Sequence, residues 1–212
     1  MPGSTHRADR TKELILATAE RLYAQHGVTA VSNRQIGEAA GQGNNTAVGY
    51  HFGTRADLVR AILRRHSGAI EAIRARLIDR YEGSTDLRDW VDCLVRPFTD
   101  HLAELGSPTW YARCAAQVMT DPALCRLVID DALTAPAVRA AVEGMNRCLP
   151  GLPAPVRAER NDMARNLIVH MSAERERALA DGTAVARPTW DATATGLTDA
   201  IVGLLQAPVT RA

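Results

Sequence analysis

Glycine and proline divide this chain into a series of segments that are each about the length of a helix. Between these residues the sequence is rich in alanine, leucine and arginine, which favour helices, and it lacks the alternating Val, Ile and Thr pattern of strands. The breaks fall at Gly27, Gly41–Gly43, Gly53, Gly83, Gly106–Pro108, Pro122, Pro136, Pro150–Pro155, Gly182 and Pro188. The pattern predicts an all-α protein of roughly ten helices.

The breaks also predict where the helices lie. A first helix is expected from Arg10 to His26, with Ile15, Ala19, Leu22 and Tyr23 on its apolar face. A short helix follows Ser32, which has Gln35 three residues on, the spacing of a capping box, and its buried face is expected to hold Ile36, Ala39 and Ala40. The other helices are expected at residues 44–50, 55–81, 86–105, 109–119, 121–133, 135–148, 155–181 and 189–206.

Composition excludes several classes of protein. With 46% hydrophobic residues the chain can bury a core, and it has no run of about 18 apolar residues that would span a membrane. Its first residues lack the apolar stretch of a secretory signal, so we expect a cytoplasmic protein. The four cysteines show no metal-binding or disulfide spacing, so no metal and no cofactor are expected.

The net charge of +1 hides an asymmetry along the chain. Residues 1–66 contain nine Lys and Arg against five Asp and Glu, a net of +4, which leaves sixteen against nineteen, a net of −3, for the rest. A basic N-terminal third favours an anionic partner at that end of the molecule.

The stretch "AGQGNNTAVGYHF", residues 40–52, lies between two expected short helices. Gly41 and Gly43 can adopt the backbone angles of a sharp turn, and two short helices joined by such a turn form a helix-turn-helix. Asn44, Asn45 and Thr46 then fall at the start of the second helix, where a recognition helix meets base edges in the major groove. Thr54 is expected to cap the long helix that follows, with Asp57 three residues on.

Residues Leu14 to Leu63 resemble the TetR family of bacterial transcriptional regulators. In that family a first helix ends in "LF…G", the next contains "IA..AG", and "Y.HF" precedes "SK..L". This chain has "LYAQHG", "SNRQIGEAAG", "YHF" and "TRADL" in the same order. Two differences stand out: one extra residue between Gly41 and His51, which leaves open whether Asn44 or Asn45 reads a base, and Arg55 where lysine is usual.

The resemblance implies a three-helix DNA-binding domain at residues 1–54 and a larger helical domain for effector binding and dimerisation at 55–212, linked by the helix at 55–81. It also implies contacts to double-stranded DNA. Tyr50 and His51 would contact or support the phosphate backbone, as would Arg55, Ser32 and Arg34, while Phe52 would pack in the core. The implied function is a dimeric repressor that a small-molecule effector releases from a palindromic operator.

The sequence says less about the effector. Large apolar side chains beside isolated polar ones are typical of ligand pockets. The candidates of this kind are Trp90, Phe98, Trp110, Arg113, Cys114 and His170, although each also fits a packed core. By the same resemblance, the last two long helices would form a four-helix bundle with their mates, with Ala200 and Gly203 allowing close packing. The alternative is that the apolar stripe of the last helix packs on its own subunit.

Two other functions remain open at this point. A helical enzyme or ligand carrier without DNA binding is one, but the sequence contains no triad spacing, phosphate loop or H-E-x-x-H, so we predict that the protein is not an enzyme. An architectural or activating DNA binder without a ligand is the other.

Overall fold

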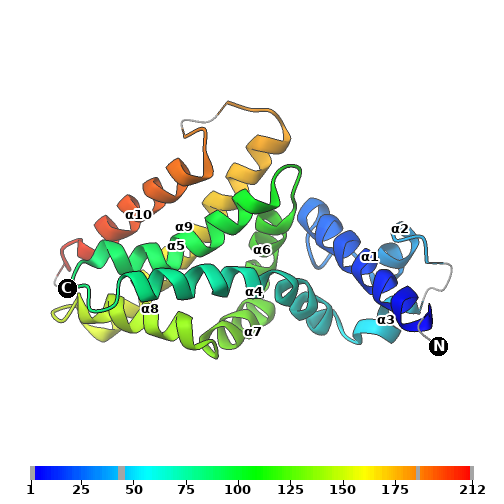
Figure 1. Ribbon diagram of the computed structural model, residues 1–212, viewed down its shortest axis with the longest axis horizontal. Helices are drawn as coiled ribbons and strands as arrows, with labels where there is room; N and C mark the ends of the chain where they lie inside the picture. The colour runs from blue at the N-terminus through cyan, green and yellow to red at the C-terminus, as the bar shows by residue number, and fades with distance from the viewer. Residues whose placement is uncertain (1–2, 43–45, 185–186, 211–212) are drawn as a thin grey trace. The chain divides into compact units, whose positions relative to one another are not determined.

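The computed structural model describes residues 3–42, 46–184 and 187–210 of the chain, and all its regular elements are helices. Figure 1 shows them in chain order. They are α1 (Gly3–His26), α2 (Asn33–Ala39), α3 (Ala47–Phe52), α4 (Arg55–Arg80), α5 (Leu87–Leu105), α6 (Tyr111–Met119), α7 (Pro122–Leu133), α8 (Pro136–Arg147), α9 (Ala154–Ala180) and α10 (Trp190–Gln206). The all-α prediction is confirmed, as are most helix bounds to within two residues.

Glycine ends helices where the sequence predicts it. Gly27 follows α1 and Gly106 follows α5, both with positive φ, a conformation that costs glycine little because it has no Cβ. The differences from prediction lie in the N-terminal quarter. Helix α1 begins at Gly3 rather than Arg10, and Ala39 of α2 is exposed rather than buried.

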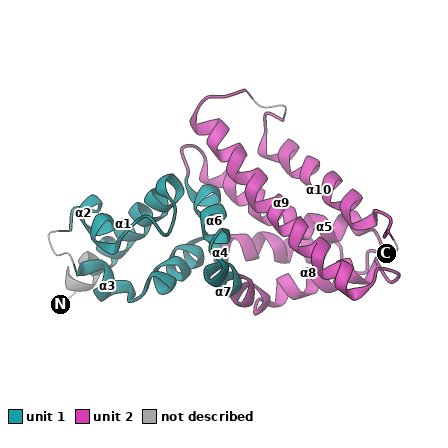
Figure 2. Ribbon diagram, turned by 180° about the vertical axis from the view of Figure 1, so that it is seen from behind, with its two compact units in different colours: residues 1–67, 110–128 teal, residues 68–109, 129–212 magenta. Residues whose placement is uncertain are grey.

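The chain forms two compact units, coloured separately in Figure 2. The first contains residues 1–67 and 110–128, and the second contains residues 68–109 and 129–212. Helix α4 contributes residues 55–67 to the first unit and 68–80 to the second. The domain boundary that we predicted at residue 54 is the end of a DNA-binding domain. It is defined by function and not by packing, so it stays a prediction.

The core of the first unit combines the predicted face of α1 with α2, α3 and α6. Ile15, Ala19 and Tyr23 are fully buried there, and Phe52 packs against the cluster from its edge. A polar contact lies within this unit as well, since His66 Nε2 of α4 is 2.9 Å from Glu20 Oε2 of α1. The His66 ring stacks on Tyr111 of α6 at 3.8 Å between ring centroids. Burial raises the pKa of the Tyr111 phenol.

The core of the second unit is built from α4, α5, α8, α9 and α10. On α10 it buries Ala194, Leu197, Ile201 and Leu205, which are four members of the predicted apolar stripe. These four residues therefore pack within their own chain, whereas Ala200, which also belongs to the stripe, and Gly203 are exposed on α10.

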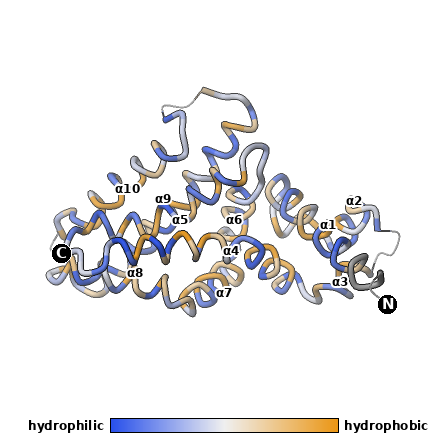
Figure 3. The backbone as a smooth tube through the Cα atoms, viewed as in Figure 1, coloured by the Kyte–Doolittle hydropathy of each residue, from blue (hydrophilic) through white to orange (hydrophobic). Residues whose placement is uncertain are grey.

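Hydrophobic residues recur at intervals along the helices, as the alternating colours of Figure 3 show. None of the helices in the described part of the chain is long and apolar enough to cross a membrane.

Candidate functional site

The start of α2 is fixed by the predicted capping box. The Ser32 hydroxyl accepts a hydrogen bond from the Gln35 backbone N–H at 3.3 Å, and the Ser32 N–H donates to Gln35 Oε1 at 2.9 Å. These bonds satisfy amide groups that have no partner within the helix. The capping box is confirmed, and it holds Ser32 at the exposed N-terminus of α2, where an anion is favoured.

Arg34 lies one residue into α2 and is exposed. Its Nε donates to Glu38 Oε1 at 2.8 Å, and this hydrogen bond raises the pKa of the guanidinium above its ordinary value. A phosphate that binds Arg34 would therefore compete with the Glu38 carboxylate for the guanidinium group.

Helix α3 presents one buried face and one open face. Val48 is buried, and its Cγ2 would lie 3.8 Å from a Cβ placed on Gly37 of α2, so the two short helices approach closely. On the other face Tyr50 is 84% exposed, and a Cβ placed on Gly49 would meet no heavy atom within 4 Å. An exposed phenol beside a bare stretch of backbone suits contact with a large partner.

The aromatic rings at the end of α3 contact one another in sequence. The Tyr50 and His51 centroids are 5.2 Å apart in an edge-on arrangement, and His51 is half-buried. Phe52 turns inward against the first core, as predicted.

The start of α4 has a second capping box, formed by Thr54 and Asp57. The Thr54 hydroxyl donates to Asp57 Oδ2 at 2.6 Å, the Thr54 N–H donates to the same oxygen at 3.1 Å, and the Asp57 N–H donates to Thr54 Oγ1 at 3.2 Å. The bonds from Thr54 hold the pKa of Asp57 below its usual range. The prediction that Thr54 caps this helix is confirmed.

Arg55 follows directly and is exposed. Its Nη2 donates to the carbonyl of Val31 at 3.4 Å, and Val31 is the residue just before the α2 cap. Burial raises the pKa of nearby Tyr23 to about 12, while the positive charge of Arg55 opposes that shift. Arg55 at the start of α4 is thus bonded to the residue that precedes the cap of α2, next to the positive ends of both helix dipoles.

The structure places six of the eight predicted DNA-contacting residues on this part of the first unit: Ser32, Arg34, Thr46, Tyr50, His51 and Arg55. Thr46 is exposed and precedes α3. Asn44 and Asn45 lie outside the described residues. A Cβ on Gly49 would have open space around it, so a partner can approach the α3 backbone closely at this position.

The six effector candidates fall into two groups. Trp110, Arg113 and Cys114 belong to the first unit, where the Arg113 guanidinium carbon lies 4.3 Å from the centre of the Trp110 ring and Cys114 is in the core. Trp90, Phe98 and His170 belong to the second unit.

Within the second unit these three side chains differ in exposure. Trp90 is buried against α8 so closely that a Cβ on Gly144 would lie 2.1 Å from its ring, Phe98 is half-buried, and His170 is exposed. Their roles as ligand contacts stay predictions.

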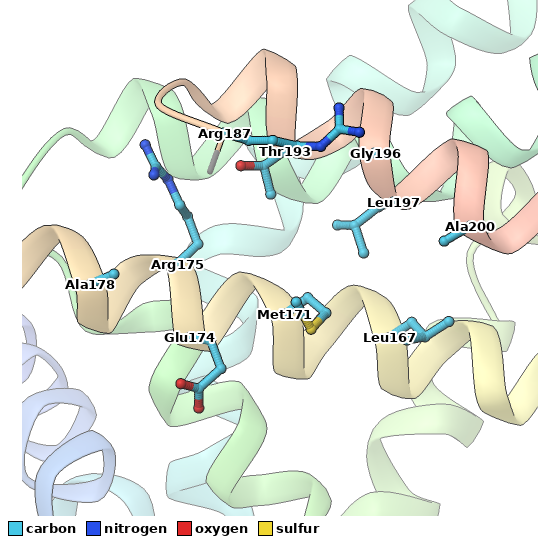
Figure 4. Close-up of a pocket in the computed structure, with 10 residues that line it drawn as sticks. All are labelled: Leu167, Met171, Glu174, Arg175, Ala178, Arg187, Thr193, Gly196, Leu197 and Ala200. Carbon is cyan, nitrogen blue, oxygen red and sulfur yellow. The ribbon is translucent and has the colours of Figure 1, made fainter. Parts of the chain in front are cut away.

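A pocket of about 550 Å³ opens between α9 and α10 of the second unit (Figure 4). Its lining residues are Leu167, Met171, Glu174, Arg175, Ala178, Arg187, Thr193, Gly196, Leu197 and Ala200, and none of the six candidates is among them. The sequence did not single out Arg175, because α9 also contains Arg157, Arg160, Arg165 and Arg177, and nothing in the sequence marks which of these arginines are buried.

Three comparisons with known proteins bear on this geometry. Residues 15–62 match a family model described as "Bacterial regulatory proteins, tetR family". A similar solved structure is NalD of Pseudomonas aeruginosa, the secondary repressor of the MexAB-OprM multidrug efflux pump, with 22% identity over 92% of this chain and 96% of that one, at a TM-score of 0.55. Another is PfmR, a TetR-family transcriptional regulator of Thermus thermophilus, with 14% identity over 93% and 96% of the two chains, at a TM-score of 0.45. No curated protein matches the chain.

Proposed function

Because the N-terminal helices of this chain belong to the TetR family of bacterial regulatory proteins, we propose that the protein is a dimeric repressor that binds a palindromic operator. The chain has the fold of a DNA-binding transcriptional regulator. The observation that most supports DNA contact is the open face of α3, where Tyr50 is 84% exposed beside Gly49. Apolar ring surface exposed to this extent favours a partner that covers it.

In this proposal α3 enters the major groove. Asn44 or Asn45, with Thr46, contacts base edges, because amide and hydroxyl groups hydrogen-bond to bases there. Tyr50, His51 and Arg55 contact phosphates next to α3, and Ser32 and Arg34 contact phosphates at the start of α2. A single module of this size reads few base pairs, so two copies related by a two-fold axis are needed to read an operator.

The dimer would form through α9 and α10. Met163, Met171 and Leu179 are exposed along α9, and Ala200 and Gly203 are exposed on α10. Exposed apolar side chains on one helix beside small residues on another favour close packing with a second copy. A small-molecule effector held in residues 55–212 would favour a dimer state whose two α3 helices no longer fit successive major grooves, and the operator would be released.

The DNA-binding proposal is tested by footprinting the protein on DNA next to its own gene and then measuring affinity by fluorescence anisotropy. Arg55→Ala is expected to weaken operator and unrelated DNA alike by about tenfold, because a guanidinium–phosphate contact has no base preference. Asn45→Ala is expected to weaken the operator selectively.

Arg76→Ala is the matched control, since Arg76 is an exposed arginine of the same helix α4 that lies in the second unit. Its operator affinity should equal that of the unchanged protein. If Arg55→Ala and Asn45→Ala both retain full operator affinity, the helix-turn-helix assignment is wrong.

The dimer is tested by sedimentation of Met163→Glu combined with Gly203→Glu, two exposed positions that do not line the α9–α10 pocket. Two buried carboxylates facing their own mates would dissociate a dimer formed through these helices. A double variant that sediments as the unchanged protein does would place the interface elsewhere.

A further inference from the structure

Tyr23 has a hydroxyl group that the core of the first unit does not use. The residue is fully buried in that core, where its ring packs as a phenylalanine ring would. The hydroxyl oxygen is buried as well, and it has no hydrogen-bond partner among the described residues. Nearly all buried polar groups in native proteins are hydrogen-bonded, because an unsatisfied one is costly. Packing alone therefore does not account for this hydroxyl.

The charged group that acts most on the Tyr23 hydroxyl is Arg55. Burial raises the pKa of Tyr23 to about 12, and the positive charge of Arg55 is the first of the influences that oppose this rise. A charge acts on a buried group mainly at short range. The guanidinium at the start of α4 and the phenol of α1 are therefore neighbours.

Arg55 has one acceptor in the structure, the carbonyl of Val31. The bond from Arg55 Nη2 is partly buried, so the side chain folds back onto the edge of the core although the residue as a whole is exposed. Its length of 3.4 Å is beyond the usual 2.7–3.2 Å of an N–H···O bond. One long bond holds a guanidinium loosely, and a second acceptor is needed to fix its orientation.

The charge of Arg55 remains available to a partner. Arg34 pairs with Glu38, and Arg65 pairs with Glu13 at 3.2 Å, whereas no carboxylate among the described residues pairs with Arg55. A guanidinium that is anchored only by neutral acceptors keeps its full charge for an anion.

This chain differs from the TetR-family pattern at both positions of the pair. Tyr23 stands where the pattern "LF…G" has phenylalanine, and Arg55 stands where "SK..L" has lysine. A planar guanidinium can donate to protein acceptors through some of its N–H groups and to a phosphate through the others. The tyrosine supplies an acceptor that phenylalanine lacks, so both differences favour the same contact.

We propose that Tyr23 is a positioning residue: its hydroxyl accepts a hydrogen bond from the Arg55 guanidinium and turns the remaining N–H groups of Arg55 toward a DNA phosphate. Tyr23 itself touches no DNA, because it is fully buried. It acts by ordering Arg55 before DNA arrives, which lowers the cost of fixing that side chain on binding. The phosphate contact rests on the proposed function, whereas the bond between the two residues is a property of the free protein.

The bond is tested first without DNA, by nuclear magnetic resonance of the full-length protein. The Arg55 Nε–Hε group, assigned from its absence in Arg55→Ala, is expected to be ordered in the unchanged protein and mobile in Tyr23→Phe. Equal order in the two proteins would overturn the proposal.

The Cζ resonance of Tyr23 gives a second measurement that needs no substitution in the core. It is expected to shift in Arg55→Ala, a change at an exposed position, because the phenol loses its donor. A Cζ resonance that stays in place would equally reject the bond.

The consequence for DNA is tested by a double-mutant cycle, measured by fluorescence anisotropy on a duplex of unrelated sequence at low salt. Tyr23→Phe is expected to lower affinity by about three- to tenfold, because ordering one long side chain on binding costs about that factor. In the Arg55→Ala background the same substitution should have no effect. A loss of equal size in both backgrounds would show that Tyr23 acts on the fold and not through Arg55.

Tyr81→Phe is the matched control, since it removes a phenol hydroxyl from the second unit and should leave DNA affinity unchanged. The two proposals fail separately. A protein that binds no DNA but shows the Tyr23-dependent order of Arg55 rejects only the repressor. Operator binding without any coupling between Tyr23 and Arg55 rejects only the positioning role.

Discussion

The capping side chains of the helix-turn-helix region bond to near neighbours in the chain, whereas the buried arginines of the second unit bond to distant carbonyls. In the first unit Ser32 pairs with Gln35 and Thr54 with Asp57, each three residues apart. In the second unit Arg74 Nη1 donates to the Cys93 carbonyl, and Arg160 Nη1 donates to the Leu205 carbonyl at 2.8 Å, across 19 and 45 residues of sequence.

These are two different ways of giving hydrogen-bond partners to backbone N–H and C=O groups. A capping side chain satisfies the start of its own helix and remains exposed, so its loss leaves groups that water can reach. The arginine at position 74 satisfies a carbonyl that Pro97 has released, because proline has no N–H to donate to the residue four positions earlier. The Cys93 carbonyl is buried against Arg74. Loss of the Arg74 guanidinium would therefore leave a buried acceptor that water cannot reach.

The largest effect is expected for Arg74→Met, which keeps an apolar stem but removes the donor to the Cys93 carbonyl. The free energy of unfolding should fall by about 1–3 kcal/mol, the usual cost of leaving a buried acceptor unsatisfied. Urea denaturation of both proteins measures this difference.

Pro97→Ala provides the control for that prediction, because an alanine at 97 supplies the missing N–H to the Cys93 carbonyl. The cost of Arg74→Met should therefore be smaller in the Pro97→Ala background than in the natural one. Equal costs in the two backgrounds would show that Arg74 stabilises the second unit by some other means.

A smaller effect is expected at the two capping boxes, which have the same geometry but different partners. Ser32→Ala should cost about 1 kcal/mol of unfolding free energy at neutral and acidic pH alike, because Gln35 does not titrate. Thr54→Ala should cost more at neutral pH than in acid, because the bonds from Thr54 hold the pKa of Asp57 below its usual range.

The sign follows from linkage: a carboxylate with a lowered pKa in the folded state stabilises the protein above its unfolded pKa, and this contribution disappears as the pH falls through the folded pKa. Unfolding measurements at pH 7 and pH 3 on both variants test the contrast, with pH values chosen on either side of a typical aspartate pKa of about 3.9. A pH-independent cost for Thr54→Ala would mean that Asp57 does not contribute through its charge.

The smallest effect is expected for Glu38→Gln, which removes the carboxylate that pairs with Arg34. Both side chains are exposed, so folding stability should hardly change. Affinity for any DNA should rise by at most about fivefold, because a charge about 4 Å away interacts only weakly in water. Anisotropy measurements at low salt reveal the gain, and it should vanish at high salt. Reduced affinity would show that Glu38 positions Arg34 for DNA.

Much of the fold was predictable because its signals are local. Gly27 and Gly106 mark helix ends through backbone freedom, and the Ser32–Gln35 spacing marks a helix start. Helix α1 extends further than predicted because residues 3–9 show no apolar periodicity to reveal it. Ala39 was assigned to the core because alanine fits either a buried or an exposed face, and small side chains give little signal.

The candidate pocket residues were less predictable because residue type does not determine burial. Trp90 is buried because Gly144 lets its ring lie against α8, a contact across 54 positions that no local pattern encodes. His170, chosen as an isolated polar group, is exposed.

The sequence by itself determined the helices and their caps, and through the ordered motifs of residues 14–63 it also identified the type of DNA-binding domain. Tertiary structure alone decided which arginines are buried and what they face. Capping depends on groups within one turn of helix, which the chain order supplies directly. The surroundings of Arg175 depend on how α9 and α10 pack, since its desolvation comes from residues that adjoin it only after folding.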